Sequence, residues 1–366
     1  MAKRAPRARV LGAAAVLALV VVAVAGIASV WAVDDPSLPA VTADDLLASA
    51  IEAASRPVTI SGDVSTTLDL GLPELPGIVG GAGVPGALAT VVGEQRWKVW
   101  SSPEGLRVAH LLPAREQDLV INARDAWWWD SAEMRAVHLD FAAFRHGSGI
   151  PPEGAGSVLP ASSMDPVALA SALIRGVSPC ASLSVQGTDR VAGRDVYVLA
   201  LIPLSSDSRV GSVRFSIDAQ TRLPLRVEVR STAGDDAPIA VGFTRVAFDP
   251  IDPAMFAFDP PAGTEIRDAS DPSAAGDAGG GADGVGDDAA GMDATPAITD
   301  VRVLGDCFGA VVAARLEGPL PSSAAQILPF AGPLGSVIAV DRGDHTWLLS
   351  GLVNADALEA RAAALP

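Results

Sequence analysis

The sequence contains few of the residues on which metal sites and nucleic-acid-binding surfaces depend. It has 4 His, 2 Cys and 1 Tyr in 366 residues, and lysine is almost absent. The formal net charge is −17 and no basic stripe interrupts it, which argues against nucleic-acid binding. His138 and His146 do not have metal-ligand spacing, and no H-E-x-x-H motif occurs. We therefore expect no metal, no cofactor and no nucleic-acid partner.

Motifs of nucleotide-binding proteins and hydrolases are also missing. The segment from Gly81 to Gly86 matches G-x-G-x-x-G in letters only. Prolines flank it, and no strand–turn–helix context aims a helix N-terminus at a phosphate. Ser148 and Ser157 do not lie in G-x-S-x-G. Since no nucleophile is paired with a base, we predict that the protein is not an enzyme.

A long uncharged run lies at the N-terminus. Residues 1–9 are basic, and the run from Val10 to Val33 has no proline and is long enough to cross a bilayer as a helix. Basic residues before it and acidic residues after it place the N-terminus in the cytoplasm and the main domain outside, as in a single-pass cell-membrane protein. The alternative is a signal peptide cleaved after Ala32, which would release a secreted protein. Because no cysteine lies near this run, lipid attachment to an N-terminal cysteine is excluded.

A low-complexity segment and two cysteines organise the rest of the chain. Residues 268–296 are rich in Gly, Ala and Asp and have no aromatic residue, so we interpret them as a disordered linker. Cys180 and Cys307 lie on opposite sides of this linker. In an exported protein, a disulfide between them would tie residues 297–366 to the main domain and stabilise it by roughly 4–5 kcal/mol. Two buried free thiols are the alternative.

Hydrophobic periodicity predicts two helices among many short strands. The segment from Thr42 to Ala54 predicts a helix that Thr42 caps. From TISGDVSTTLDL to RAVHLDF the apolar period is two, which indicates an antiparallel meander. MDPVALASALIRGV predicts a second helix, and further strands follow it up to IAVGFTRVAFD. After the linker we expect strands in ITDVRVLGDCFGAVVAARL and HTWLLSGLV, then a terminal helix. This order predicts an α+β fold.

Four motifs in the second half of the main domain carry a family likeness. They are GRDVYVL, the strand FSID before TRLP, the strand FTRVAF and the closing FAFDPPAG. Together with WWWD in the first half, they make the chain resemble the LolA-like family over 42–267. It is most similar to membrane-anchored actinobacterial members, and its preference for arginine is typical of GC-rich genomes. The resemblance implies a strongly curved, incomplete antiparallel β-barrel with helices on the concave face. We expect residues 297–366 to form a β/α extension packed on it.

The resemblance also implies a function. LolA-like carriers hold the acyl chains of a lipoprotein in an apolar cavity, so we expect a hydrophobic ligand, either lipid or an acylated protein. RseB-like relatives sense envelope stress through a protein partner such as an anti-sigma factor, which is the alternative. The cavity candidates are Leu68, Leu70, Trp97, Val99, Trp127 and Trp129.

Two segments are candidates for a lid over this cavity. One is the nearly uncharged loop between Leu70 and Gly93, and the other is the predicted second helix. The alternative for the loop is a cover over the sheet edge. The lid candidates are Leu72, Leu75, Ile78, Val79, Leu169 and Leu173.

Three adjacent tryptophans lie in one predicted strand. Side chains alternate along a strand, so Trp127 and Trp129 share one face and Trp128 lies on the other. We expect the pair on the concave face with Trp97, either lining a ligand or filling the core. We expect Trp128 on the convex face, partly exposed.

Overall fold

Two β-sheets and two α-helices make up the part of the chain that the computed structural model describes. These residues are 36–69, 71, 93–141, 180–234, 236–269, 298–318, 320 and 328–365. The chain divides into Met1–Ser37 and Leu38–Pro366, and the second unit contains all of the described elements. The predicted membrane span at 10–33 and the predicted second helix lie outside the described residues. Within the described ranges, no helix is long and apolar enough to cross a bilayer.

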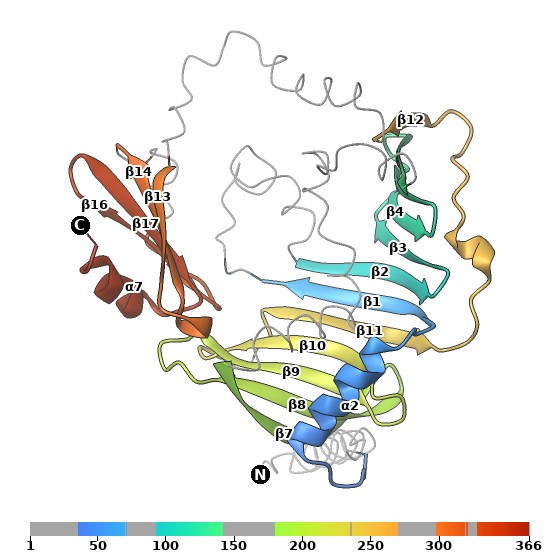
Figure 1. The fold of residues 1–366 in the computed structure, drawn as a ribbon, viewed down its shortest axis with the longest axis horizontal. Coiled ribbons are helices and arrows are strands. Elements are labelled where there is room, and N and C mark those ends of the chain that lie inside the picture. The colour runs from blue at the N-terminus through green and yellow to red at the C-terminus, as the bar shows by residue number, and fades with distance from the viewer. Residues whose placement is uncertain are drawn as a thin grey trace, which may run out of the picture. The chain divides into compact units, whose positions relative to one another are not determined.

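The larger sheet has 12 strands and curls without closing into a barrel (Figure 1). Its order is β12-β6-β5-β4-β3-β2-β1-β11-β10-β9-β8-β7, so β12 and β7 form the edges. The open, curved sheet agrees with the predicted incomplete barrel. The sheet is not antiparallel throughout, which corrects the prediction. After β11 in the middle of the sheet, the chain crosses to the β6 edge, where β12 pairs with β6 in parallel. The bounds are β1 Ile60–Leu68, β2 Gly93–Ser102, β3 Gly105–Leu112, β4 Arg115–Asn122, β5 Asp125–Asp130, β6 Arg135–Asp140, β7 Ala181–Val191, β8 Arg194–Pro203, β9 Val210–Asp218, β10 Pro224–Ser231, β11 Ile239–Ala247 and β12 Glu265–Asp268.

The register of the β-ladders assigns every side chain to one of two faces. Leu119 lies opposite both Trp128 and Val108, and Val108 lies opposite Val99. These residues share one face, which we call the inner face. Residues at the alternate positions, such as Trp129, form the outer face.

The first helix, α2 (Ala43–Ser55), packs on the inner face of β7, β8 and β9. The Thr42 side-chain oxygen accepts a hydrogen bond of 3.1 Å from the Asp45 N–H, which confirms the predicted cap. Leu46 and Ala50 are buried in a cluster with side chains of the sheet such as Phe215. The helix therefore covers one end of the inner face.

The smaller sheet has five strands in the order β13-β14-β17-β16-β15. The helix α7 (Ala355–Ala362) packs on β16 and β17, and the Asn354 side chain caps its N-terminus. Trp347 and Leu358 are buried between the helix and the sheet. The terminal helix was predicted, but β16 was not. The bounds are β13 Ile298–Leu304, β14 Val311–Glu317, β15 Phe330–Ala331, β16 Ser336–Asp341 and β17 His345–Gly351.

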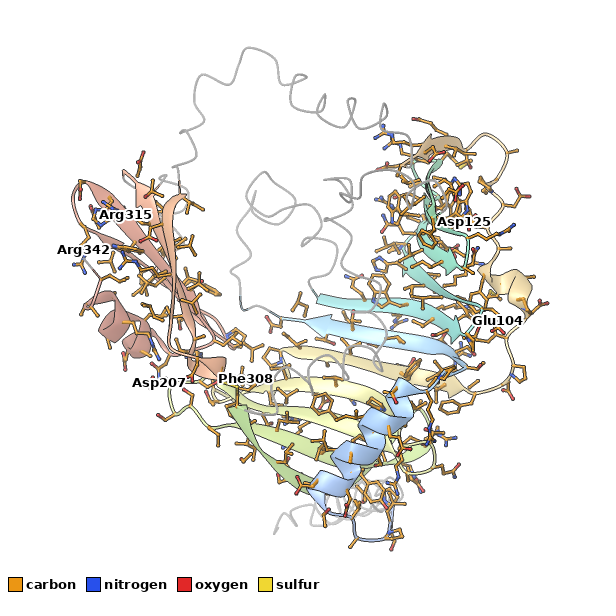
Figure 2. All side chains as sticks on the ribbon, viewed as in Figure 1. Glu104, Asp125, Asp207, Phe308, Arg315 and Arg342 are labelled. Carbon is orange, nitrogen blue, oxygen red and sulfur yellow. A yellow bond between two sulfur atoms is a disulfide. The ribbon has the colours of Figure 1, made fainter. Side chains whose placement is uncertain are left out.

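The two sheets are joined by a disulfide and by backbone hydrogen bonds. Cys180 and Cys307 are bonded, with a Cα–Cα distance of 5.6 Å, so the alternative of two free thiols is wrong. The N–H of Arg209 donates to the Leu352 carbonyl, and Phe308 packs into the cluster that α2 covers. Figure 2 shows Phe308 and Asp207 at this junction. Residues far apart in the sequence therefore share one core.

The disulfide generates the first prediction. Replacing both cysteines in the full chain, Cys180→Ser with Cys307→Ser, should lower the free energy of unfolding by about 2–5 kcal/mol, because the closed loop spans 127 residues. Urea unfolding in the absence of reductant measures the change. Wild-type protein treated with dithiothreitol is the matched control and should unfold at the urea concentration of the double variant. Equal midpoints for untreated wild type and double variant would contradict the prediction.

Candidate ligand-binding face

The inner face of β3–β6 is apolar and half-buried. Apolar side chains of these strands lie opposite one another across the ladders, as in the pair Trp128 and Val137. A polar row that includes Asp130 and Arg135 borders them on the same face. Alternation along each strand is typical of a sheet that buries one face. The half-buried set is Leu106, Leu119, Ile121, Ala126, Trp128, Val137 and Leu139.

A hydrogen-bonded cluster of polar and aromatic side chains lies beside this apolar surface on β1, β2 and β3. The Trp97 indole N–H donates to the Thr66 hydroxyl at 3.1 Å. The Trp97 ring stacks on the imidazole of His110, with 3.7 Å between centroids and 14° between planes. His110 is buried, and its Nε2 lies 3.1 Å from Oε1 of Gln95. These hydrogen bonds satisfy polar atoms that would otherwise be costly to bury.

Three of the predicted cavity residues lie on the inner face. Trp97 and Val99 are buried in a cluster with Val64 and Phe243, so they fill core rather than line an open surface. Leu68 is half-buried on the same face, near the start of β2. Leu70 lies outside the described residues. The lid candidates Leu72, Leu75, Ile78, Val79, Leu169 and Leu173 also lie outside them.

The three tryptophans lie on the faces opposite to those that we predicted. Trp127 and Trp129 are on the outer face, whereas Trp128 is on the inner face with Trp97. Alternation separates Trp128 from its neighbours, but it does not say which face is which. The pairing of β4 with β5 decides that, because a shift by one residue would exchange the faces.

The returning chain covers the outer face at this point. We call Asp252–Phe258, which includes the 3₁₀ helix η4 (Pro253–Phe256), the strap. The Phe258 ring lies 5.5 Å from Trp127 and 6.0 Å from Trp129, and Asn122 donates 3.0 Å to the Phe256 carbonyl. Trp127 and Trp129 therefore hold the strap rather than line a cavity.

A glycine allows the strap to approach this closely. A Cβ on Gly105 would lie 2.8 Å from the Phe256 ring and 2.4 Å from the Ile121 carbonyl oxygen. Under the strap, Val120 and Ala136 are fully buried on the outer face. The motif FAFDPPAG contains both strap phenylalanines, and it was the sequence signal that could have assigned the outer tryptophans.

One buried ion pair lies on each face of this part of the sheet, on the outer face with the strap and on the inner face. Arg107 pairs with the buried Asp118 on the outer face, and Arg115 pairs with the buried Asp130. Burial opposes ionisation of Asp130, but hydrogen bonds from Arg115, Gln117 and backbone N–H groups outweigh burial and lower its pKa. Among the described residues, no group of three or more His, Cys, Asp or Glu could hold a metal ion.

Comparison with known proteins gives structural matches only. No protein-family model and no curated protein sequence matches this chain. The MucA/MucB complex of Pseudomonas aeruginosa is similar at 14% identity over 87% of this chain and 96% of that chain, with a TM-score of 0.40. A LolA superfamily protein of Nitrosomonas europaea matches at 15% identity over 60% of this chain and 99% of its own, with a TM-score of 0.24. The Mycobacterium tuberculosis lipoprotein LppX matches at 12% identity over 57% and 97%, with a TM-score of 0.29.

The strap generates a prediction about coupling. In a double-mutant cycle, Trp129→Ala and Phe258→Ala should show a coupling energy of about 0.5–1.5 kcal/mol, because the two rings are in contact. Chemical denaturation of the four proteins measures it. The matched cycle of Trp128→Ala with Phe258→Ala should show none, since Trp128 is on the other face. Equal coupling in both cycles would refute the assigned faces.

The buried imidazole generates a prediction about pH. Burial lowers the pKa of His110 below its ordinary value of 6.5, a hydrogen bond that the imidazole donates to Gln117 opposes this shift, and the charge of Arg115 adds to it. The unfolded chain therefore binds a proton near pH 6.5 while the folded chain does not. The contribution of neutral His110 to the free energy of unfolding is fully present above that pH. It is lost as the pH falls through the lower pKa of His110 in the folded state.

The variant His110→Gln should lose less stability than the wild type between pH 7 and about pH 5, since it lacks the proton uptake of the unfolded state. Denaturation midpoints at both pH values measure the difference. Trp129→Gln, which changes no titratable group, is the control, and it should lose as much stability as the wild type over this pH range. An unchanged pH dependence in His110→Gln would contradict the interpretation.

Proposed function

We propose that this protein is a non-enzymatic, membrane-anchored protein outside the cytoplasm that binds a hydrophobic ligand, either lipid or lipoprotein acyl chains, on its inner face. The observation that carries the proposal is the half-buried apolar surface of β3–β6. Its members contribute no charged group, and an acyl chain needs none. Burying such a chain is favourable by about 25 cal/mol per Å² of apolar surface removed from water.

The segments that pack on each face of the sheet support a ligand site on the inner face of β3–β6. The strap buries the outer face of β3–β5, and α2 buries the inner face of β7–β9. The inner face of β3–β6 remains half-buried, with Trp128 as its largest side chain. An indole combines a large apolar area with a rigid ring, which suits a flexible chain. We place the ligand there rather than beside Trp127 and Trp129.

The remaining parts of the proposal rest on the sequence. Residues 10–33 form the membrane anchor, residues 42–267 the ligand-binding domain and residues 268–296 a linker. The loop after Leu70 and the predicted helix with Leu169 and Leu173 act as lids that open for ligand exchange.

A second candidate function is binding of a protein partner as an envelope sensor. The observation in its favour is the face of the smaller sheet opposite α7. There, Val301 and Val303 are 59% and 67% exposed, and Ile298 and Val312 are exposed beside them. Exposed apolar patches of this kind mark interaction sites. The smaller sheet would then bind the partner while the large sheet binds the ligand.

An acyl-probe titration tests the leading proposal. Full-length protein should bind a fluorescent fatty acid, and the double variant Leu119→Gln with Trp128→Gln should bind it at least about tenfold more weakly, since each substitution removes apolar contact worth more than about 1 kcal/mol. Energy transfer from tryptophan to the probe, or probe polarisation, gives the affinity.

The matched control is Trp129→Gln, which removes a tryptophan of the same strand from the outer face. It should leave probe affinity unchanged once folding is verified by circular dichroism. Absence of binding to the wild type would overturn the proposal, and so would equal weakening by the inner-face and outer-face variants.

A further inference from the structure

A group of cations crosses the outer face of the large sheet on β2, β11, β10 and β9. We call it the basic belt, and it consists of Arg96, Lys98, Arg245, Arg226, Arg230 and Arg214. The same face of these strands and of β1 between them carries four carboxylates, Glu94, Asp63, Glu228 and Asp218, so the local formal charge is 6 − 4 = +2. The whole chain has a formal charge of −17, so this face has the opposite sign to the molecule.

Two of the carboxylates in the belt are outnumbered where they lie. Asp63 of β1 is opposite both Lys98 of β2 and Arg245 of β11, and it pairs with Arg245. Glu228 of β10 is opposite Arg214 and two residues from Arg226 and Arg230 on the same face. It contacts Arg226 at 2.8 Å and Arg230 at 3.7 Å. Asp63 therefore lies between two cations, and Glu228 is surrounded by three.

The floor between the cations is made of small side chains. One row across the sheet runs from Arg96 through Ser65 and Gly242 to Arg226 and Ser216. A Cβ on Gly242 would lie 2.7 Å from Cγ of Arg226, so the arginine stem lies directly on this glycine. Three strand spacings separate Arg96 from Arg226, or roughly 14 Å. The belt is thus a broad, low surface rather than a pocket for one small anion.

Three cations of the belt are exposed, whereas Arg230 is 28% exposed and Lys98 and Arg214 are half-buried. The side chains of Arg96, Arg245 and Arg226 are 80%, 78% and 44% exposed. Trp100 lies on the same face of β2 as Arg96 and Lys98 and is half-buried. An indole next to basic side chains is a combination that favours the headgroup region of a bilayer.

We infer that the basic belt is a docking surface for the anionic phospholipid headgroups of the membrane in which the chain is anchored. The inference rests on the membrane anchor in the proposed function but not on the acyl ligand. Residues 34–42 connect the proposed span to α2, and these nine residues (42 − 34 + 1 = 9) reach at most roughly 30 Å. So short a tether keeps the domain near the bilayer, where attraction to anionic lipid acts over about one Debye length, ~8 Å at physiological salt.

The lysine content of the chain provides a direct probe of the belt. Its only lysines are Lys3 and Lys98, so amine acylation at Lys98 can be located by peptide mass spectrometry. The full chain is placed in nanodiscs of phosphatidylcholine alone or of phosphatidylcholine with phosphatidylglycerol. With the anionic lipid, Lys98 should react at least about threefold more slowly, and the difference should vanish at about 1 M salt, where the Debye length is ~3 Å.

A belt variant and a matched control test the surface. The triple variant Arg96→Gln, Arg226→Gln, Arg245→Gln should react at the same rate in both kinds of nanodisc. The control Arg56→Gln, Arg190→Gln, Arg302→Gln removes three other exposed arginines, each also paired with a carboxylate, and should keep the wild-type difference.

Equal Lys98 rates for the wild type in both kinds of nanodisc would overturn the inference, as would a belt variant that keeps the difference. Loss of the difference in the control triple would equally overturn it, because general charge would then be responsible. Acyl-probe affinity should be the same in wild type and belt variant, so failure of ligand binding and failure of membrane docking are separate results.

Discussion

The antiparallel pairing of β4 with β5 is the constraint on which the two faces of the large sheet depend. Leu119 lies opposite Trp128, and Asp118 lies opposite Trp129. A slip of one residue would send Trp127 and Trp129 to the inner face and Trp128 to the outer face. It would also bury the apolar side chains of one strand against the charged side chains of the next, which has a large desolvation cost. The buried ion pair of Arg107 with Asp118 and the strap contacts support the observed register.

Each face of this sheet is covered by a different part of the chain. On the inner face, α2 packs at the β7 end of the sheet, and it is the first described element of the chain. On the outer face, the strap packs at the β3–β5 end, and it follows β11 directly in the sequence. Between them the outer face is polar and carries the basic belt, while the inner face stays apolar. A single sheet thus provides two different surfaces.

The disulfide and the junction with the smaller sheet extend the same core. Phe308 and Leu334, both C-terminal to the linker, are buried with Val210 and Phe215 of β9. The backbone bridge between Ser208 and Val353 adds a short sheet-like contact. These contacts therefore connect residues on opposite sides of 268–296.

Local physical chemistry in the sequence determined much of the architecture. Thr42 and Leu46 predicted α2, because a capping hydroxyl followed by an apolar stripe needs no tertiary information. A period of two predicted the strands, and the closing motif with the strand motifs before it indicated an open, curved antiparallel sheet. The composition of 268–296 predicted a linker, which lies outside the described residues from 270 on, and the predicted export signal made a bond between Cys180 and Cys307 the preferred interpretation.

Tertiary structure decided which face each residue occupies and what covers it. Alternation separates Trp128 from Trp127 and Trp129, but it does not say which of them faces the core. That depends on the register with the neighbouring strands β4 and β6 and on the strap, whose Phe258 is more than 120 residues from Trp129 in the sequence. The parallel pairing of β12 with β6 depends on the path of that same segment. The basic belt arises in the same way. Its six cations come from four strands that are dispersed in the sequence, and only the hydrogen-bonded order β2-β1-β11-β10-β9 places them on one surface.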